Sequence, residues 1–321
     1  MQMPQPEISI IMITYNHGPY IGKAIESVIA QSVFQQTELL IGDDCSQDET
    51  FKIASSFAAQ YPDNIHLFRS SPEPLGPHRN FERLCRAMRA PFVAFLEGDD
   101  WWIDPHKLET QLALLKAHNA CSFCGAYTEV VDERDLSMRS KSSLKLIKPS
   151  QEGDELDFSA LIRGFHFHIS SVLMRSTALM MPDWIYSQYC LDRPLYLLAA
   201  QHGNAVVLHR VVSVYRQHGT GVWASRSAWE RAQRSWSLFH TFMQVFPARY
   251  CILFRRTLSE ILWSYLPEVL YQKEPVPRAQ ARKIIHLSVV ESPYQRLLLK
   301  PRLTLAALYY AYLRLPHGSA S

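Results

Sequence analysis

The sequence lacks an apolar run long enough to cross a membrane. The apolar stretch 303–313 is far shorter than the roughly 20 residues that a spanning helix needs. The N-terminus also lacks a basic region with a cleavage site, and its first apolar run has the pattern of a strand. We therefore expect a cytoplasmic protein without a membrane-spanning helix.

Cysteine is scarce, with six residues in 321, which fits a compartment where thiols stay reduced. Cys121 and Cys124 have the spacing of a redox or zinc motif, but no second pair accompanies them. They also lie in a predicted strand, so we interpret both as structural.

The chain has little net charge, +3 in total, but the charge is unevenly distributed. Residues 1–224 hold 19 Lys and Arg against 25 Asp and Glu, a net of −6. Residues 225–321 hold 14 against 5, a net of +9. A hydrophobic share of 47% is that of a globular protein. We expect one large domain at 1–224, followed by a basic helical region at 225–321.

The basic region has two alternative roles. It is rich in Leu and Tyr and could lie as a peripheral element on an anionic membrane surface, at the inner face of the cytoplasmic membrane. Alternatively, its helices pack on the first domain and expose their arginines to water. The region lacks a recognised nucleic-acid-binding motif, so we expect no nucleic acid partner.

Strand and helix patterns alternate four times in the first hundred residues. Predicted strands at 7–14, 38–42, 65–68 and 91–96 are each followed by apolar residues at helical spacing. This alternation predicts an α/β fold with a parallel sheet and helices on its faces. Ligands of such sheets bind outside the carboxyl ends of the strands. Three polar segments fall there and should converge on one crevice: Thr14-Tyr15, Asp43-Asp44 and Glu97-Gly98-Asp99.

The tetrapeptide Glu97-Gly98-Asp99-Asp100 places three carboxylates where a buried strand meets solvent. Such carboxylates repel one another unless a cation or hydrogen-bond donors compensate them. Hard oxygen ligands suit Mg²⁺ or Mn²⁺, which also hold substrate phosphates. The alternative is an acidic loop that only caps the next helix, since Asp104-Pro105 is a good N-cap and first-turn pair.

In these motifs the chain resembles the family-2 glycosyltransferases of the GT-A fold, over roughly residues 7–224. In that family a first strand ends in Thr-Tyr-Asn, a second in Asp-Asp-x-Ser, and a later one in an Asp-x-Asp type motif. Further segments match the family's nucleotide loop and acceptor half: 76–81, 191–195, Gly203 and 214–218. The resemblance implies a GT-A type, Rossmann-like sheet flanked by helices, with the C-terminal helices as an appendage.

The resemblance also implies a nucleotide-sugar donor in the crevice and transfer to an acceptor hydroxyl with inversion. Asp44, or its neighbour Asp43, would accept a hydrogen bond from the base, and Thr14-Tyr15 would line the nucleoside. Asp99 would bind the metal, Mn²⁺ or Mg²⁺. Where the family usually has Asp, this chain has Glu97, whose longer side chain could reach the ribose or a metal-bound water instead.

The acceptor half supplies the remaining expected roles. Asp192 matches the family's base, and a free Asp with a pKa near 4 is ionised at neutral pH. His218 resembles a histidine that some relatives add as a metal ligand, and Arg216 or Arg79 could meet the diphosphate. The alternatives are a helix cap for Asp192 and a hydrogen-bonded surface role for His218.

Aromatic and histidine side chains could contact the acceptor. Trp102 and Trp223 could offer flat apolar faces to a sugar ring, although such tryptophans are often simply core. In the family, the region that corresponds to residues 165–171 borders the acceptor, so His166 or His168 could contact it.

Two functions of different classes follow. The first is an inverting, metal-dependent glycosyltransferase that moves sugar from a UDP- or dTDP-sugar to a glycan or lipid-linked acceptor. Its expected pathway is a bacterial cell-surface polysaccharide, such as O-antigen or capsule. The second is a non-catalytic nucleotide-sugar-binding module with an assembly or regulatory role. Asp99, Asp192 and His218 together favour the enzyme, because a pure binder needs no base opposite the phosphate.

Overall fold

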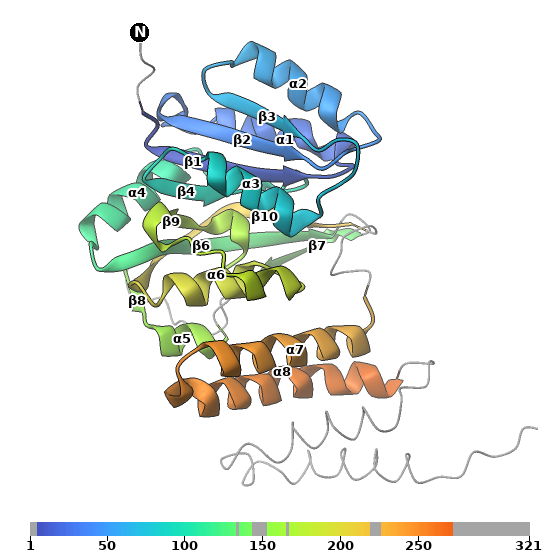
Figure 1. Ribbon diagram of the computed structural model, residues 1–321, viewed down its shortest axis with the longest axis vertical. Coiled ribbons are helices and arrows are strands. Elements are labelled where there is room, and N and C mark those ends of the chain that lie inside the picture. Colours follow the sequence, from blue (N-terminus) through green and yellow to red (C-terminus); the bar gives the residue numbers. More distant parts are fainter. Residues whose placement is uncertain (1–4, 133–134, 143–152, 165–166, 219–225, 272–321) are drawn as a thin grey trace, which may run out of the picture. The chain divides into compact units, whose positions relative to one another are not determined.

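The structure, a computed structural model, describes residues 5–132, 135–142, 153–164, 167–218 and 226–271 (Figure 1). The chain divides into two compact units, residues 1–219 and 220–321, and each is described by itself. The strands of the first unit are β1 (Ile8–Thr14), β2 (Thr37–Asp43), β3 (Ile65–Arg69), β4 (Phe92–Phe95), β5 (Trp101–Trp102), β6 (Cys121–Asp132), β7 (Asp135–Ser142), β8 (Glu155–Leu156), β9 (Leu173–Arg175) and β10 (Asn204–Gln217). Its α-helices are α1 (Gly18–Ile29), α2 (Thr50–Gln60), α3 (Pro77–Ala87), α4 (Lys107–Ala117), α5 (Phe158–Ile162) and α6 (Asp192–Ala199).

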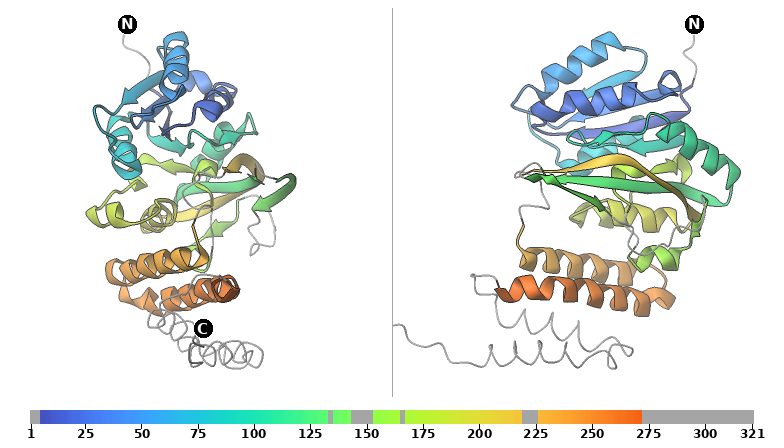
Figure 2. Two further views of the ribbon diagram at one scale, coloured as in Figure 1. Left: turned by 90° about the vertical axis from the view of Figure 1, so that its right-hand side faces the viewer. Right: turned by 180° about the vertical axis from the view of Figure 1, so that it is seen from behind.

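Within the described residues, the ten strands form one sheet in the order β3-β2-β1-β4-β9-β6-β10-β5, with β7 on β6 and β8 on β10. The first four in this order run parallel, which confirms the prediction from the alternating patterns. Beyond them the directions are mixed, because β9 runs antiparallel to both β4 and β6. Strands β6 and β10 are parallel and run alongside each other, as Figure 2 shows.

The core lies between the sheet and its helices. Strand β2 is buried over its whole length, as expected for a parallel strand covered on both faces. In α1 the buried residues recur at helical spacing: Ile21, Ala24, Ile25 and Val28. Full burial of an Ile or Val side chain contributes about 1.5–3 kcal/mol, so this one stripe is enough to hold α1 on the sheet.

Strand pairing brings the expected site segments to one edge of the sheet. Thr14 at the end of β1 pairs with Asp43 at the end of β2. Beyond β4 the chain continues along β1, where the Gly98 amide donates to the Ile13 carbonyl over 3.0 Å. The short strand β5 then pairs antiparallel with β10, which carries the segment ending at Gln217 to the acidic tetrapeptide.

The second unit contains a helical hairpin of α7 (Ala228–Val245) and α8 (Cys251–Tyr271). A capping box starts α7, in which the Ser227 and Glu230 side chains each accept a hydrogen bond from the other's backbone amide. Phe254 of α8 packs against Phe239 and Phe242 of α7. Within the described residues, no helix combines the length and apolarity that crossing a bilayer would require.

Candidate active site

Three carboxylates lie together after β4. Burial raises the pKa of Glu97 well above its usual value, and the charges of Asp99 and Asp192 add to this. Burial raises the pKa of Asp100 as well, and the charges of Asp99 and Glu97 add to this. The cluster therefore carries more negative charge than its surroundings compensate, as expected for a site that receives a cation.

Asp99 lies between two histidines. Nε2 of His218 is 3.0 Å from Oδ2 of Asp99, and Nε2 of His17 is 3.8 Å from the same oxygen. Burial raises the pKa of Asp99, but the hydrogen bond with His218 and the nearby His17 outweigh it and hold the pKa below the usual value. The structure thus brings the two predicted metal ligands together. His17 is an addition, and its position directly after the Thr-Tyr-Asn turn is the signal that could have identified it.

Asp100 is fixed on the other side of the cluster. Its Oδ1 accepts a hydrogen bond of 2.9 Å from the Arg216 amide, while its Oδ2 lies 3.6 Å from Nδ1 of His168. Burial lowers the pKa of His168 to about 4, so this imidazole is neutral at physiological pH and can serve as a ligand. His168, expected near the acceptor, therefore borders the carboxylates, whereas His166 lies outside the described residues.

The arrangement fits a divalent cation. Oδ1 of Asp99 and Oδ2 of Asp100 are buried and have no hydrogen-bond partner. One ligand atom each from Glu97, Asp100 and His168 lies within 4.8 Å of the others. Helix α4 begins at Lys107, and its N-cap residue His106 has no side-chain cap hydrogen bond. Asp104 accepts a 2.9 Å hydrogen bond from the His106 amide, so the expected N-cap at Asp104 is corrected, and the tetrapeptide lies further upstream. The capping alternative therefore does not account for the tetrapeptide.

Asp192 is the first residue of α6 and accepts a hydrogen bond from the Ile169 amide. Burial raises the pKa of Asp192 to about 6, although this amide and its own amide favour the charged form. The expected pKa near 4 is therefore corrected, because the burial of this side chain cannot be read from the local sequence pattern. The charge of Asp192 also acts on Glu97, which places this carboxylate beside the acidic cluster.

The two aspartates at the end of β2 differ in their partners. Asp44 accepts three hydrogen bonds of 2.7–2.8 Å, from the Ser70 hydroxyl and from the Leu75 and Gly76 amides. It thereby holds the loop before α3. Asp43 is fully buried, and its Oδ1 has no hydrogen-bond partner. Of the two aspartates considered for base recognition, Asp44 already has a structural task.

Thr14, one of the two residues expected to line the nucleoside, lies beside Gly98. The Thr14 hydroxyl is buried without a partner, and the Tyr15 side chain is half exposed. A Cβ atom on Gly98 would lie 2.6 Å from the Thr14 hydroxyl and 2.9 Å from Nδ1 of His17. No other residue fits there without displacing these groups, which gives a packing reason for glycine in the tetrapeptide.

The two arginines proposed for the diphosphate lie in different surroundings. Arg216 donates through Nε to the Asp99 carbonyl over 3.0 Å, and its guanidinium packs on the rings of Tyr20 and Trp101. Arg79 pairs with Glu82 on the same helix and lies over the ring of Tyr186. The structure thus brings Arg216, but not Arg79, to the acidic cluster.

The expectation that Trp102 forms an acceptor platform is corrected. Its side chain is only 4% exposed, and its Nε1 donates to the Ser170 carbonyl over 2.7 Å. The Lys107 ammonium also lies 4.4 Å from the centre of the ring. Consecutive side chains of a strand point to opposite faces, so Trp102 points inward while Trp101 stays partly exposed. Trp223 lies outside the described residues.

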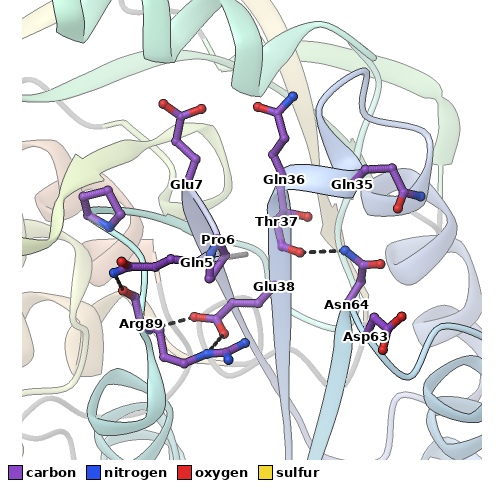
Figure 3. A pocket seen from close by; sticks show the side chains of 11 residues that line it. Gln5, Pro6, Glu7, Gln35, Gln36, Thr37, Glu38, Asp63, Asn64 and Arg89 are labelled. Carbon is purple, nitrogen blue, oxygen red and sulfur yellow. Dashed lines mark hydrogen bonds and ion pairs between the residues drawn. The ribbon is translucent and has the colours of Figure 1, made fainter. Parts of the chain in front are cut away.

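A hollow of about 810 Å³ lies at the opposite edge of the sheet, where β2 and β3 begin (Figure 3). Several of its polar groups are joined by hydrogen bonds. Glu38 accepts from the Arg89 amide and guanidinium over 2.7 Å each, and Asn64 donates to the Thr37 carbonyl over 2.9 Å. These hydrogen bonds stabilise the starts of the strands, which gives the polar groups of the hollow a structural role. We therefore take the acidic cluster as the candidate site.

Comparisons with solved structures agree with this fold. The solved structure of S. aureus TarS 1-349 has a TM-score of 0.66 at 15% identity, covering 95% of this chain and 87% of that chain. The mannosyltransferase PcManGT of Pyrobaculum calidifontis, solved with GDP-Man and Mn²⁺, has a TM-score of 0.60 at 17% identity, covering 97% and 88%. The fold is therefore of the GT-A type, with additional C-terminal helices.

Sequence comparison identifies the family. The uncharacterized protein Rv1520 of Mycobacterium tuberculosis is 28% identical over 321 residues, which are 96% of this chain and 85% of that protein. The family model described as glycosyl transferase family 2 matches residues 9–179. The chain belongs to glycosyl transferase family 2.

Proposed function

We propose that this protein is an inverting, metal-dependent glycosyltransferase that uses a nucleotide-sugar donor. The sugar passes to a hydroxyl of a glycan or lipid-linked acceptor, in the assembly of a bacterial cell-surface polysaccharide. Membership of the family supports sugar transfer, and the site supports the finer assignments. TarS has been solved with UDP-GlcNAc and PcManGT with GDP-Man, so the proposal includes both uracil and guanine nucleotides beside the dTDP-sugars.

The observation that carries the proposal is the pairing of Asp99 with His218 beside a separate carboxylate, Asp192. Asp99 has a lowered pKa and is ionised, with Oδ1 unpartnered. Asp192 has a pKa of about 6, which makes it a stronger base than an ordinary carboxylate while it stays mostly ionised at neutral pH. Two carboxylates with opposite pKa shifts suit two different tasks.

Asp192 is the proposed general base. It takes the proton of the acceptor hydroxyl as the hydroxyl oxygen forms a bond to the anomeric carbon. The bond from that carbon to the diphosphate breaks on the opposite face, so the configuration inverts. The Ile169 amide holds the Asp192 carboxylate in position throughout.

The opposite face receives the leaving diphosphate. Asp99 and His218, with Glu97, Asp100 and His168 beside them, are the residues that would hold a divalent cation. When bound, Mn²⁺ or Mg²⁺ would offset the negative charge of the diphosphate. Arg216 is fixed against the same carboxylates and adds positive charge on that side.

Calorimetric titration with UDP, GDP and dTDP, each with and without Mn²⁺, tests the proposal. We expect one nucleotide to bind tightly only when Mn²⁺ is present. Asp99→Asn should abolish the effect of the metal. Asp63→Asn, at an exposed position beside the opposite edge of the sheet, is the matched control and should behave as the wild type. If Mn²⁺ changes the affinity for none of the three nucleotides, metal dependence is wrong.

The alternative, a non-catalytic binding module, predicts the same titration but no chemistry. Incubation with the sugar form of the nucleotide that binds separates the two, because the enzyme slowly hydrolyses or transfers the sugar. Release of free nucleotide that Asp192→Asn abolishes supports the enzyme. Tight binding without nucleotide release, with acceptor extracts present, supports the module.

The proposal also assigns separate roles to the two parts of the chain. Residues 1–224 would form the catalytic domain, and the basic residues 225–321 would hold it at the inner face of the cytoplasmic membrane. Sedimentation of the full chain with anionic and with neutral vesicles tests this. Binding to anionic vesicles alone, reversed by salt, is the expected result. Failure to bind either kind would assign the basic helices to packing.

A further inference from the structure

A second cluster of metal-ligand side chains lies where three elements meet. His118 is the C-cap residue of α4, Cys121 is the first residue of β6, and Glu155 is the first residue of β8. One ligand atom from each residue lies within 4.8 Å of the other two. These residues have no part in the proposed transfer reaction.

The side chains of this cluster already point at one another. Nδ1 of His118 is 3.0 Å from Oε1 of Glu155, and the Cys121 thiol hydrogen bonds to the same carboxylate. Asn204 donates to the other oxygen, Oε2, over 3.0 Å. Glu155 is thus oriented by a neighbour, as ligating carboxylates commonly are. Cys121 itself is 1% exposed, so this donor lies at the inner end of the cluster.

The local backbone explains why Cys121 joins this cluster. Asn204 of β10 pairs with Cys121, but the next residue, Ala205, pairs with Phe123, so Ser122 is an extra residue in β6. Such a bulge re-aims the side chains next to it. Cys124 has a different partner, a hydrogen bond with the Gln111 side chain. The Cys-x-x-Cys spacing therefore does not form one site, and Cys121 works with residues distant in sequence.

The cluster is separate from the acidic site. Cys121 and Asn204 stand at the amino ends of the parallel strands β6 and β10. Glu97 to Asp100 lie beside the other end of β10, where Trp101 pairs with Val214. An ion in one place therefore leaves the ligands of the other available.

We propose that His118, Cys121 and Glu155 bind a Zn²⁺ ion. Imidazole, thiolate and carboxylate are the three ligand types that zinc sites use, whereas Mg²⁺ prefers oxygen ligands alone. Three protein ligands leave one position of a tetrahedral ion to water. Cys121 loses its proton to solvent as the ion binds. The ion links the end of α4 to the starts of β6 and β8, and it thereby stabilises the packing of these three elements.

Cobalt substitution in the full chain tests the site, because Co²⁺ bound to a thiolate gives a charge-transfer absorption band that oxygen and nitrogen ligands do not give. We expect the metal-free protein to develop this band on addition of Co²⁺ and to lose it on addition of Zn²⁺. Competition with a chromophoric chelator then measures the zinc affinity. Cys121→Ser should abolish the band, and Zn²⁺ should raise the melting temperature of the wild type only.

Matched controls separate this cluster from the rest of the molecule. Cys124→Ser and Cys190→Ser should keep the band. His106→Gln tests a His-Glu pair that has the same 3.0 Å separation but no cysteine, and it should change nothing. Co²⁺ bound at the acidic cluster gives no thiolate band. The band therefore reports only on the His118, Cys121 and Glu155 cluster, and it tests this site independently of metal binding at the acidic cluster.

Two results would overturn the proposal. One is a wild-type protein without the thiolate band, and the other is a band that persists in folded Cys121→Ser. If Cys121→Ser does not fold, His118→Gln and Glu155→Gln replace it. Each should weaken zinc binding by at least about tenfold, and unchanged zinc affinity in both would contradict the assignment.

Discussion

Nε2 of His218 lies 3.0 Å from Oδ2 of Asp99, although the two residues are 119 positions apart in the chain. Pairing of β5 with β10 makes this contact, because it carries the end of β10 to the acidic tetrapeptide. His17 approaches the same oxygen from the turn after β1. One carboxylate thus connects three segments of the fold.

His218→Ala should weaken Mn²⁺-dependent nucleotide binding by about 10–100-fold, a typical loss when a group that supports a metal site is removed. His17→Ala should have a smaller effect, because its nitrogen is 3.8 Å from Asp99. Titration of Mn²⁺ followed by electron paramagnetic resonance measures both. His202→Ala, at an exposed position, is the control. Wild-type affinity in His218→Ala would remove it from the ligand set.

Asp192→Asn should retain donor affinity and lose transfer by about 10²–10⁴-fold, the usual contribution of a general base. In the wild type, the rate should fall as the pH drops through about 6, since burial raises the pKa of Asp192 to about 6 and only the ionised form accepts a proton. Rates at saturating donor, measured across this range, check both statements. Equal loss of donor binding in Asp192→Asn would contradict the separation of roles.

The same substitution should stabilise the fold. Burial raises the pKa of Asp192 from the ordinary Asp value of 3.8 to about 6, so its charged form is disfavoured in the native state. The contribution of the Asp192 carboxyl to the free energy of unfolding is fully present below its unfolded pKa. It is lost as the pH rises through about 6, where the buried carboxyl becomes charged. Asp192→Asn should therefore raise the free energy of unfolding at neutral pH by up to about 3 kcal/mol.

Urea unfolding at two pH values measures this gain. It should shrink to about half near pH 5, where wild-type Asp192 is largely protonated. Asp63→Asn, at an exposed position, is the control. A variant that is less stable than the wild type at neutral pH would refute the argument.

Gly98→Ala should destabilise the protein by about 1–3 kcal/mol, the usual cost of overpacking, and should impair nucleotide binding. The added methyl group would meet the Thr14 hydroxyl at 2.6 Å and His17 at 2.9 Å. Gly22→Ala is a matched control inside α1, where the new Cβ would lie 3.9 Å from Ile53. That change should stabilise by about 0.5–1 kcal/mol, because alanine favours helix. Thermal unfolding of both variants tests the contrast.

The first half of the sheet and much of the site could be predicted from local pattern. Apolar strands ending in polar residues were enough to place Thr14 beside Asp43, as their pairing confirms. The reversed strand β9 was not predicted to be antiparallel, because a three-residue strand carries no signal of direction.

Other features depend on tertiary packing. Two adjacent tryptophans do not reveal which one faces the core, and only the pairing of β5 with β10 decides it. The raised pKa of Asp192 comes from burial that the neighbouring sequence does not encode. The pairing of Arg79 with Glu82 could have been predicted from sequence, because Glu82 lies three residues further along the same helix.

The short turn Ile169–Ser171 touches both halves of the site. The Ile169 amide holds Asp192, and the Ser170 hydroxyl lies 2.7 Å from the His168 ring beside Asp100. The Ser171 carbonyl accepts from the buried Gln111. A substitution in this turn would alter donor affinity and catalytic rate together. Evolution toward new acceptors would therefore have to leave the turn Ile169–Ser171 unchanged and vary the surrounding loops. The same constraint applies to engineering the enzyme for a new acceptor.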